Sequence, residues 1–310
     1  MSMGKITVAA LQIGSDYKGK VATLENILAF EARILASGTR LTVMPEALLG
    51  GYPKGEDFGT RLGFRMPEGR EAFARYYENA IDMDGPELAE LAGLSTRTGS
   101  ALVLGVIERA GSSLFCTAVF IEPEHGVVAK HRKLMPTGTE RLIWSQGDGS
   151  TMPVVSSKAG KLGAAICWEN HMPLFRTAMY AKGVEIWCAP TVDERDVWRS
   201  SMRHIAHEGR CFVISCCQVQ PSPTDLGTHV EGWDAERPLI GGGSMIVGPL
   251  GDVLAGPLEN KTALLATEID TAELIRARYD LDVVGHYSRP DVFSLSVDES
   301  ARKGICFSGS

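Results

Sequence analysis

The sequence predicts an α/β fold in which helices pack on mixed β-sheets. Apolar, strand-like runs alternate with stretches of helical periodicity along most of the chain. The first unit has the order strand, helix, strand, which favours a layered sheet with right-handed crossovers. A hairpin-like pair follows later, so neighbouring strands can also run antiparallel. These observations together predict a mixed sheet.

The first half of the chain supplies most of the predicted strands. The expected elements are a strand at 5–13, a helix from 21 to 37, a strand at 41–44, a helix at 86–98, a strand at 101–107, and a hairpin of 114–121 with 126–130. Pro45 closes the second strand, and a loop rich in glycine and charge is expected at 50–70.

The second half repeats the alternation. Its expected elements are strands at 162–166, 184–189 and 211–217, with helices at 174–181 and 197–208. The glycines at 241–243 precede a strand at 244–247 and lack the Lys-Ser/Thr of a phosphate loop, so we interpret them as a tight turn. Because no linker or break in composition appears, residues 1–310 are expected to form a single domain, with 271–310 as a C-terminal helix and tail.

Composition and charge exclude several classes of protein. The net charge of −7 is spread along the chain, and the longest basic cluster is only 130–133, which argues against a nucleic-acid partner. No run approaches the roughly 18 apolar residues that span a bilayer, so no membrane association is expected. Seven cysteines without regular spacing indicate reduced thiols. We therefore expect a cytoplasmic protein.

Three polar residues stand where an apolar strand ends, which is where α/β folds place reactive groups. Glu46 closes LTVMPE, Lys133 closes VVAKHRK and Cys167 closes KLGAAIC. Each has an ordinary alternative: a small buried hydrophobe for the cysteine, a solvated carboxylate for the glutamate, a surface cation for the lysine. Together they supply a nucleophile, a proton acceptor and a cation for transition-state charge.

The turn that carries Cys167 adds to this hypothesis. The sequence CWENHMP marks a change from strand to helix, and the N–H groups of the following turn can face a developing anion. Such a position is expected to lower the pKa of the Cys167 thiol.

Longer motifs give the chain a resemblance to the nitrilase superfamily, whose signature is a Glu–Lys–Cys triad in that chain order. The motifs run over nearly the whole chain and read AALQIG, MPEALLGGYP, HRKLMPTGTERLIW, AAICWENHMP, APT and VVGHYSRPDVF. The resemblance implies an αββα sandwich that stacks into αββααββα in a homodimer or a higher homo-oligomer.

The resemblance also implies a role for each site residue. Glu46 is the general base, Cys167 the nucleophile, and Lys133 with the backbone N–H of Trp168 stabilises charge on the substrate nitrogen or oxygen. Glu140 matches a second carboxylate near the triad that positions Lys133 and the substrate. Its alternative is a loop surface charge.

Within the superfamily, the residues after the cysteine resemble the nitrile-hydrolysing branch. These are Trp168, Glu169, Asn170 and Pro173, and the segment 136–141 resembles that branch as well. The expected substrate is a small nitrile. An amidase or carbamoylase with the same triad remains an alternative, and so does a catalytically silent binding protein, against which the intact triad argues.

No cofactor and no metal are expected. His204 and His207 with Cys211, and the vicinal Cys216 and Cys217, lack the spacing of metal motifs. Of the tryptophans, Trp187 lies inside an apolar strand and is expected in the core, while Trp144 is expected either in a pocket or in the core.

Overall fold

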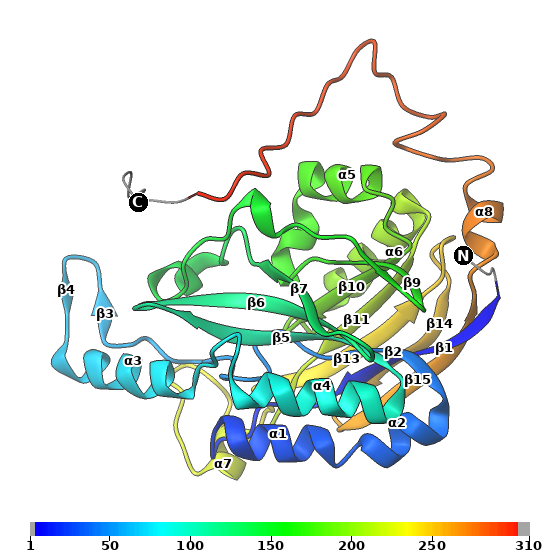
Figure 1. The fold of residues 1–310 in the computed structure, drawn as a ribbon. Coiled ribbons are helices and arrows are strands. Elements are labelled where there is room, and N and C mark those ends of the chain that lie inside the picture. Colours follow the sequence, from blue (N-terminus) through cyan, green and yellow to red (C-terminus); the bar gives the residue numbers. More distant parts are fainter. Residues whose placement is uncertain (1–3, 303–310) are drawn as a thin grey trace, which may run out of the picture.

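Two β-sheets lie face to face in the structure, a computed structural model that describes residues 4–302 (Figure 1). The first sheet has six strands in the order β15-β1-β2-β5-β6-β7. Their bounds are β1 Lys5–Gln12, β2 Thr39–Val43, β5 Ala101–Ala110, β6 Ser113–Glu122, β7 Gly126–Arg132 and β15 Ala263–Asp270. Strands β1, β2 and β5 pair in parallel and the remaining neighbours antiparallel, so the sheet is mixed as predicted.

The second sheet has seven strands in the order β12-β13-β11-β10-β9-β8, with β14 paired to β13. Their bounds are β8 Val155–Ser157, β9 Gly160–Ala164, β10 Ile186–Thr191, β11 Phe212–Cys217, β12 Val219–Gln220, β13 Ile240–Val247 and β14 Val253–Glu259. The central strands β9, β10 and β11 are parallel. This sheet is therefore mixed too.

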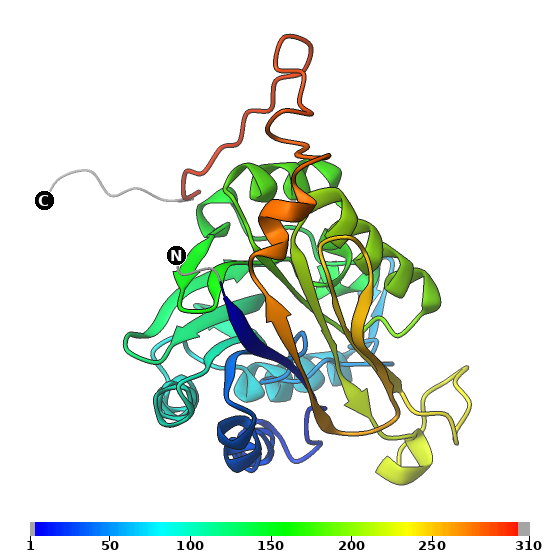
Figure 2. The same ribbon diagram turned by 90° about the vertical axis from the view of Figure 1, so that its right-hand side faces the viewer.

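Helices cover the outer face of each sheet (Figures 1 and 2). Helices α1 Lys20–Leu28 and α4 Pro86–Thr98 pack on the first sheet through one apolar cluster, and α2 Glu31–Ser37 lies against α4, β2 and β15. Helices α5 Pro173–Ala181 and α6 Asp196–Gly209 pack on the second through another. A third cluster fills the space between the sheets. The predicted αββα sandwich is confirmed.

The cluster between the sheets draws side chains from both halves of the chain, including Val43 of β2 and Ile214 of β11. On this ground we propose that the chain forms one domain. The short helix α8 Glu273–Ala277 is followed by chain without helix or strand up to residue 302, and the division into a C-terminal helix and tail at 271–310 stays a prediction. The rest of that prediction, 303–310, lies outside the described residues.

Three local predictions are wrong. The helix expected from 21 to 37 is two helices, because the N–H of Phe30 bonds Ile27 three residues back and interrupts the α-helical pattern. The loop expected at 50–70 contains a hairpin, β3 Thr60–Arg61 with β4 Phe64–Arg65, and the start of α3 Pro67–Asn79. The short helix α7 Pro223–Leu226 lies in the loop between β12 and β13.

The glycines at 241–243 form no turn but lie within β13. The register against β14 shifts between Gly242 and Ser244, and Gly242 and Gly243 have φ angles of 87° and 107°. A Cβ on Gly242 would lie 2.4 Å from the amide nitrogen of Gln12. A β-bulge pressed against a neighbouring side chain, rather than a turn, therefore requires these glycines.

Candidate active site

The predicted residues Glu46, Lys133 and Glu140 meet at one end of the sandwich. Glu46 follows β2, Lys133 follows β7, and Glu140 lies in the 3-10 turn Gly138–Leu142. The Nζ atom of Lys133 donates hydrogen bonds to Glu46 Oε1 at 2.7 Å and to Glu140 Oε2 at 2.8 Å. One ammonium thus bridges two carboxylates.

Lys133 has no exposed side-chain surface, and its Nζ lies 5.5 Å from the ring centroid of Trp144. Burial lowers the pKa of this lysine, but the negative charge of Glu46 and of the other acidic groups around it outweighs burial, and the pKa lies well above its usual value. Lys133 is therefore a fixed cation.

Glu46 is fully buried, and its backbone carbonyl accepts a hydrogen bond of 2.7 Å from the amide of Gln218. Burial raises the pKa of Glu46 to about 7, against the opposing effect of Lys133. Among the residues that the structure describes, no donor reaches its second oxygen, Oε2. A carboxylate with this pKa and a free acceptor atom suits a general base.

Cys167 begins the 3-10 turn Cys167–His171, directly behind β9. Its φ is 49°, a left-handed conformation that is strained in residues other than glycine and typical of functional sites. The amide of Asn170 holds its carbonyl oxygen at 2.8 Å, and the hydroxyl of Thr191 donates to its Sγ at 3.2 Å. The sulfur is thereby fixed in place.

The predicted direction of the thiol pKa is wrong. Burial raises the pKa of Cys167 far above its usual value, the charge of Glu46 raises it further, and Lys133 and the Thr191 hydroxyl oppose these effects only in part. A five-residue 3-10 turn contributes too little aligned dipole to compensate. The resting sulfur is therefore a thiol, whose proton has to leave during attack.

Glu140 is held from three sides. Its Oε2 also accepts a 2.6 Å bond from the backbone N–H of Thr137, and its Oε1 accepts a 2.9 Å bond from the hydroxyl of Tyr52. Its side chain is 11% exposed. These bonds fit a residue that positions Lys133 better than a loop surface charge.

Trp168, the next residue in the turn, is 43% exposed. The first N–H groups of a helical turn have no partner within that turn, so the Trp168 backbone N–H is available to a ligand. Its indole N–H donates to Asp193 Oδ2 at 3.0 Å, and the guanidinium of Arg195 lies 5.1 Å from its ring centroid.

Sequence reasoning missed a buried pair beneath the site. Glu169 accepts bonds from the backbone N–H groups of Leu134 and Ile166 at 2.6 and 2.8 Å, and from His131 at 2.9 Å. Burial lowers the pKa of His131, but Glu169 raises it more, and the net shift is upward. The pair joins the segment behind Lys133 to the cysteine turn, and its only sequence signal lies inside the HRK and CWE motifs.

A cavity of about 380 Å³ opens beside Glu140 and Tyr52. Phe58, Leu142 and Trp144 contribute apolar walls to it. Trp144 is 3% exposed, so it is both a core residue and a pocket residue, while Trp187 is fully buried as predicted. The residues lining this cavity do not include Cys167.

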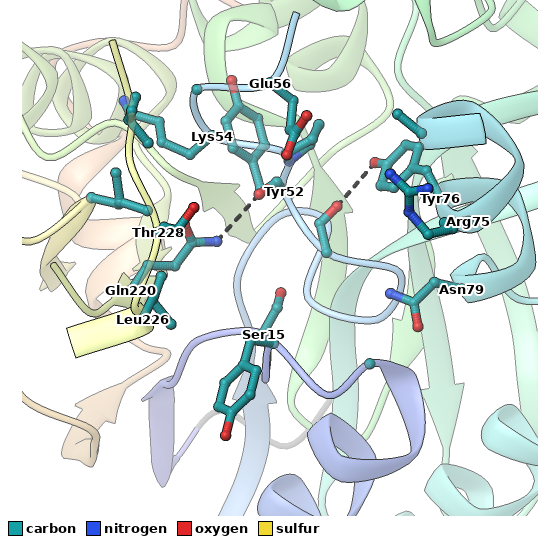
Figure 3. Close-up of a pocket in the computed structure, with 18 of the residues that line it drawn as sticks. Ser15, Tyr52, Lys54, Glu56, Arg75, Tyr76, Asn79, Gln220, Leu226 and Thr228 are labelled. Carbon is teal, nitrogen blue, oxygen red and sulfur yellow. Dashed lines mark hydrogen bonds between the residues drawn. The ribbon is translucent and has the colours of Figure 1, made fainter. Parts of the chain in front are cut away.

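A larger cavity of about 790 Å³ lies on the other side of the loop that carries Tyr52 (Figure 3). Gln220 reaches across it to the backbone carbonyl of Tyr52, and the hydroxyl of Tyr76 bonds the carbonyl of Gly51. Its lining mixes acidic and basic side chains, among them Glu56 and Arg75. The loop between the two cavities is therefore anchored by residues that line the larger one.

Between residues 4 and 302, no group of three or more His, Cys, Asp and Glu side chains is placed to hold a metal ion. His204 instead lies beside Glu208 on the surface. Over the same residues, no helix has the length and apolar character needed to cross a membrane.

Comparison with known proteins bears on the family of this chain. Residues 7–279 match the family model described as carbon-nitrogen hydrolase. The chain belongs to this family. A nitrilase of Bradyrhizobium diazoefficiens is 48% identical to this carbon-nitrogen hydrolase over 300 residues, covering 96% of this chain and 93% of its own. A bifunctional nitrilase/nitrile hydratase of Nicotiana tabacum is 46% identical, covering 97% and 88%.

A solved structure supports the fold of this carbon-nitrogen hydrolase. Nit3 of Saccharomyces cerevisiae, described as a member of branch 10 of the nitrilase superfamily, superposes with a TM-score of 0.71 at 20% identity. The match covers 92% of this chain and 97% of that one. At this identity the likeness bears on the fold alone.

Proposed function

We propose that this enzyme is a nitrilase, which hydrolyses a small nitrile to a carboxylic acid and ammonia through a covalent bond to Cys167. The observation that carries the proposal is the buried ammonium of Lys133, fixed between Glu46 and Glu140. Relatives with nitrilase names at 46 to 48% identity over nearly the full chain support it.

In the first step the sulfur attacks the nitrile carbon. The thiol proton passes to Glu46, whose Oε2 is the free acceptor, and the Sγ–C bond forms. The electron pair that leaves the carbon–nitrogen bond collects on nitrogen, where Lys133 donates a proton and the Trp168 N–H a hydrogen bond. Glu46 then passes the thiol proton to Lys133 across the 2.7 Å bond between them, which restores the carboxylate and the ammonium. The product is a thioimidate.

Two water molecules complete the reaction. The first adds to the thioimidate carbon with Glu46 as base, while Lys133 protonates the nitrogen and takes up the water proton from Glu46 across the bond between them. A second proton from Lys133 turns the nitrogen into a leaving group, and as ammonia departs the hydroxyl proton of the tetrahedral adduct returns to Lys133. This leaves a thioester. The second water, activated in the same way, releases the acid and returns the proton to Cys167.

The walls of the smaller cavity point to the class of nitrile. Phe58, Leu142 and Trp144 are apolar and face a space of about 380 Å³ next to Glu140. Lys54, Glu56 and Asp57 line the same space, so the volume is the feature that bears on the substrate, and it suits a small substituent rather than a long one.

The test is a panel of aliphatic, aryl and arylacetonitriles with ammonia as the readout, alongside the matching amides and N-carbamoyl compounds. Nitrile consumption with release of acid and ammonia is expected. Activity confined to amides or N-carbamoyl compounds would replace the proposal by an amidase or carbamoylase that uses the same triad. Absence of all three activities would favour a binding protein.

We also propose a homo-oligomer in the cytoplasm. Leu174 on α5 and Val197 on α6 are 69% and 57% exposed on the outer helical layer, the layer through which the sandwich is expected to stack. The six cysteines among the described residues are free and buried, as in a reducing compartment. Light scattering is expected to give at least twice the mass of one chain, and a reversible shift to monomer is expected for Leu174→Glu.

A further inference from the structure

The end of β10 and the residues after it contact both the nucleophile and the residue next to it. Thr191, the last residue of β10, donates its hydroxyl to Cys167 Sγ at 3.2 Å and accepts the backbone N–H of Asp193 at 2.9 Å. Asp193 accepts the indole N–H of Trp168 at 3.0 Å. One short stretch of chain therefore fixes the sulfur and the Trp168 side chain together.

Asp193 is itself held firmly. Arg195 donates to both of its carboxylate oxygens, at 2.8 Å to Oδ1 and 2.5 Å to Oδ2, and the Asp193 side chain is 5% exposed. The same guanidinium lies over the Trp168 ring. On its other side the indole meets His171 edge to face, with centroids 5.9 Å apart. The half-exposed indole is thus clamped by a neutral ion pair.

The peptide bond between Cys167 and Trp168 needs such support. The left-handed conformation of Cys167 persists only where the surroundings over-determine it. Asn170 holds the carbonyl end of this peptide at 2.8 Å. Because the C=O and N–H of a trans peptide point in opposite directions, the orientation of that carbonyl also sets the direction of the Trp168 N–H. The contacts of Asp193, Arg195 and His171 with the indole restrain the Trp168 end of the same peptide.

We propose that Asp193 is a positioning residue, which acts through the Trp168 indole to hold the Trp168 peptide N–H where it meets the developing charge. Arg195 keeps the carboxylate in place and covers the ring. The inference rests on the proposed function in one respect, because it takes this N–H as a donor to the reacting nitrogen or oxygen. It predicts that loss of Asp193 weakens binding of that charge without changing access to the thiol.

An aldehyde probe tests this without turnover. Butyraldehyde adds to the Cys167 thiol as a hemithioacetal: the Sγ–C bond forms, the carbonyl π electrons move to oxygen, and the thiol proton ends on that oxygen. The oxygen occupies the place of the developing charge. Iodoacetamide alkylation of Cys167, followed by mass spectrometry, gives the thiol reactivity, and its suppression by butyraldehyde gives the dissociation constant of the adduct.

The variants are Asp193→Ala, Asp193→Asn, Trp168→Phe and the double variant Asp193→Ala with Trp168→Phe. Asp193→Ala is expected to raise the aldehyde dissociation constant about tenfold or more, as for a displaced oxyanion donor, with alkylation in the absence of aldehyde within about threefold of wild type. Asp193→Asn keeps an oxygen acceptor for the indole, so its aldehyde dissociation constant is expected to lie between those of the wild type and Asp193→Ala. The double variant is expected to bind the aldehyde no more weakly than the weaker-binding single variant, because both changes break the same contact between Asp193 and the Trp168 indole.

The control is Glu259→Gln, which removes an exposed ion pair with Arg199 on another part of the surface and is expected to behave as wild type. The proposal is overturned if Asp193→Ala leaves the aldehyde dissociation constant unchanged, or if its alkylation rate falls by the same factor as its affinity for the aldehyde. It is also overturned if the two changes multiply in the double variant, or if butyraldehyde does not protect the wild type from alkylation. A wild type that is protected but hydrolyses no nitrile contradicts the proposed function alone.

Discussion

Replacing Glu140 by glutamine tests the electrostatics of the site through the pH dependence of the rate. In the proposed mechanism Glu46 acts in its ionised form, so the rate is expected to rise as pH increases through about 7, the pKa of Glu46 in this structure. The charge of Glu140 contributes to raising that pKa. Removal of the charge is therefore expected to move the acidic limb of kcat/KM to lower pH.

The geometry sets the size of the shift. Lys133 bridges the two carboxylates with bonds of 2.7 and 2.8 Å, which places the bridged oxygens within about 5.5 Å of one another. Two unit charges at that separation interact with about 3 kcal/mol at an effective dielectric constant of about 20, equivalent to about two pH units. Since Lys133 lies between them and shields part of this repulsion, a shift of about one to two pH units is expected.

The same variant is expected to lose rate and change its products. Without the Glu140 carboxylate, Lys133 is less well placed to protonate the departing nitrogen, and turnover is expected to fall by about 10²-fold. The tetrahedral adduct then expels the cysteine sulfur more often, so the amide fraction is expected to rise. Ammonia release across a pH series gives the position of the acidic limb of kcat/KM, and chromatography of acid and amide from one nitrile gives the product ratio.

The control for this series is Glu124→Gln, which removes a surface carboxylate paired with Lys158 and is expected to leave the pH profile in place. The electrostatic reasoning is refuted if the acidic limb of kcat/KM stays in place in Glu140→Gln or moves to higher pH. A wild-type rate with an unchanged product ratio would make Glu140 a loop charge without a role in proton transfer.

Three further predictions concern the nucleophile, metal independence and the buried pair. Cys167→Ala is expected to abolish turnover and keep the fold, and residual hydrolysis, or inactivation through alkylation of another cysteine seen by mass spectrometry, would contradict the assignment. Activity is expected to survive EDTA, and a loss that zinc reverses would contradict the metal-free mechanism. Glu169→Gln is expected to lower the free energy of unfolding by about 2–4 kcal/mol in denaturant titrations, since it weakens a buried partner of His131 and of two backbone N–H groups. Because Glu169 raises the pKa of His131 in the folded state, that part of the stability is present below the unfolded pKa and lost as pH rises, so the deficit is expected to be larger at pH 6 than at pH 9.

The proposed catalytic residues could be singled out in the sequence because each ends an apolar run. Glu46 and Cys167 follow parallel strands of different sheets, β2 and β9, and a polar residue at such a position stands out against its neighbours. The pattern alone does not say that the two sheets face each other with these ends together. That step came from the resemblance to a family, and the structure agrees with it.

Residues that act through loop geometry could not be found in this way. Tyr52 reaches Glu140 from 88 positions away, and Asp193 reaches Trp168 from 25. Neither follows a period of two or 3.6 residues, so no periodic pattern marks them. The bulge at Gly242 was misread for a related reason, since the Gln12 side chain that excludes a Cβ there comes from another strand.

Burial also explains the wrong thiol prediction and its consequence for the proposed reaction. A strand-to-helix turn suggests a stored thiolate, whereas burial and Glu46 hold the proton on sulfur until a substrate arrives. The resting site then carries two carboxylates and one ammonium. Transfer of the thiol proton to Glu46 moves one negative charge to sulfur, and attack moves it on to the nitrile nitrogen, beside Lys133 and the Trp168 N–H. The net charge of the buried site stays constant as the charge migrates and as Lys133 gives its proton to the nitrogen, so the protein dipoles need little reorganisation, which is the condition under which a preorganised site lowers a barrier most.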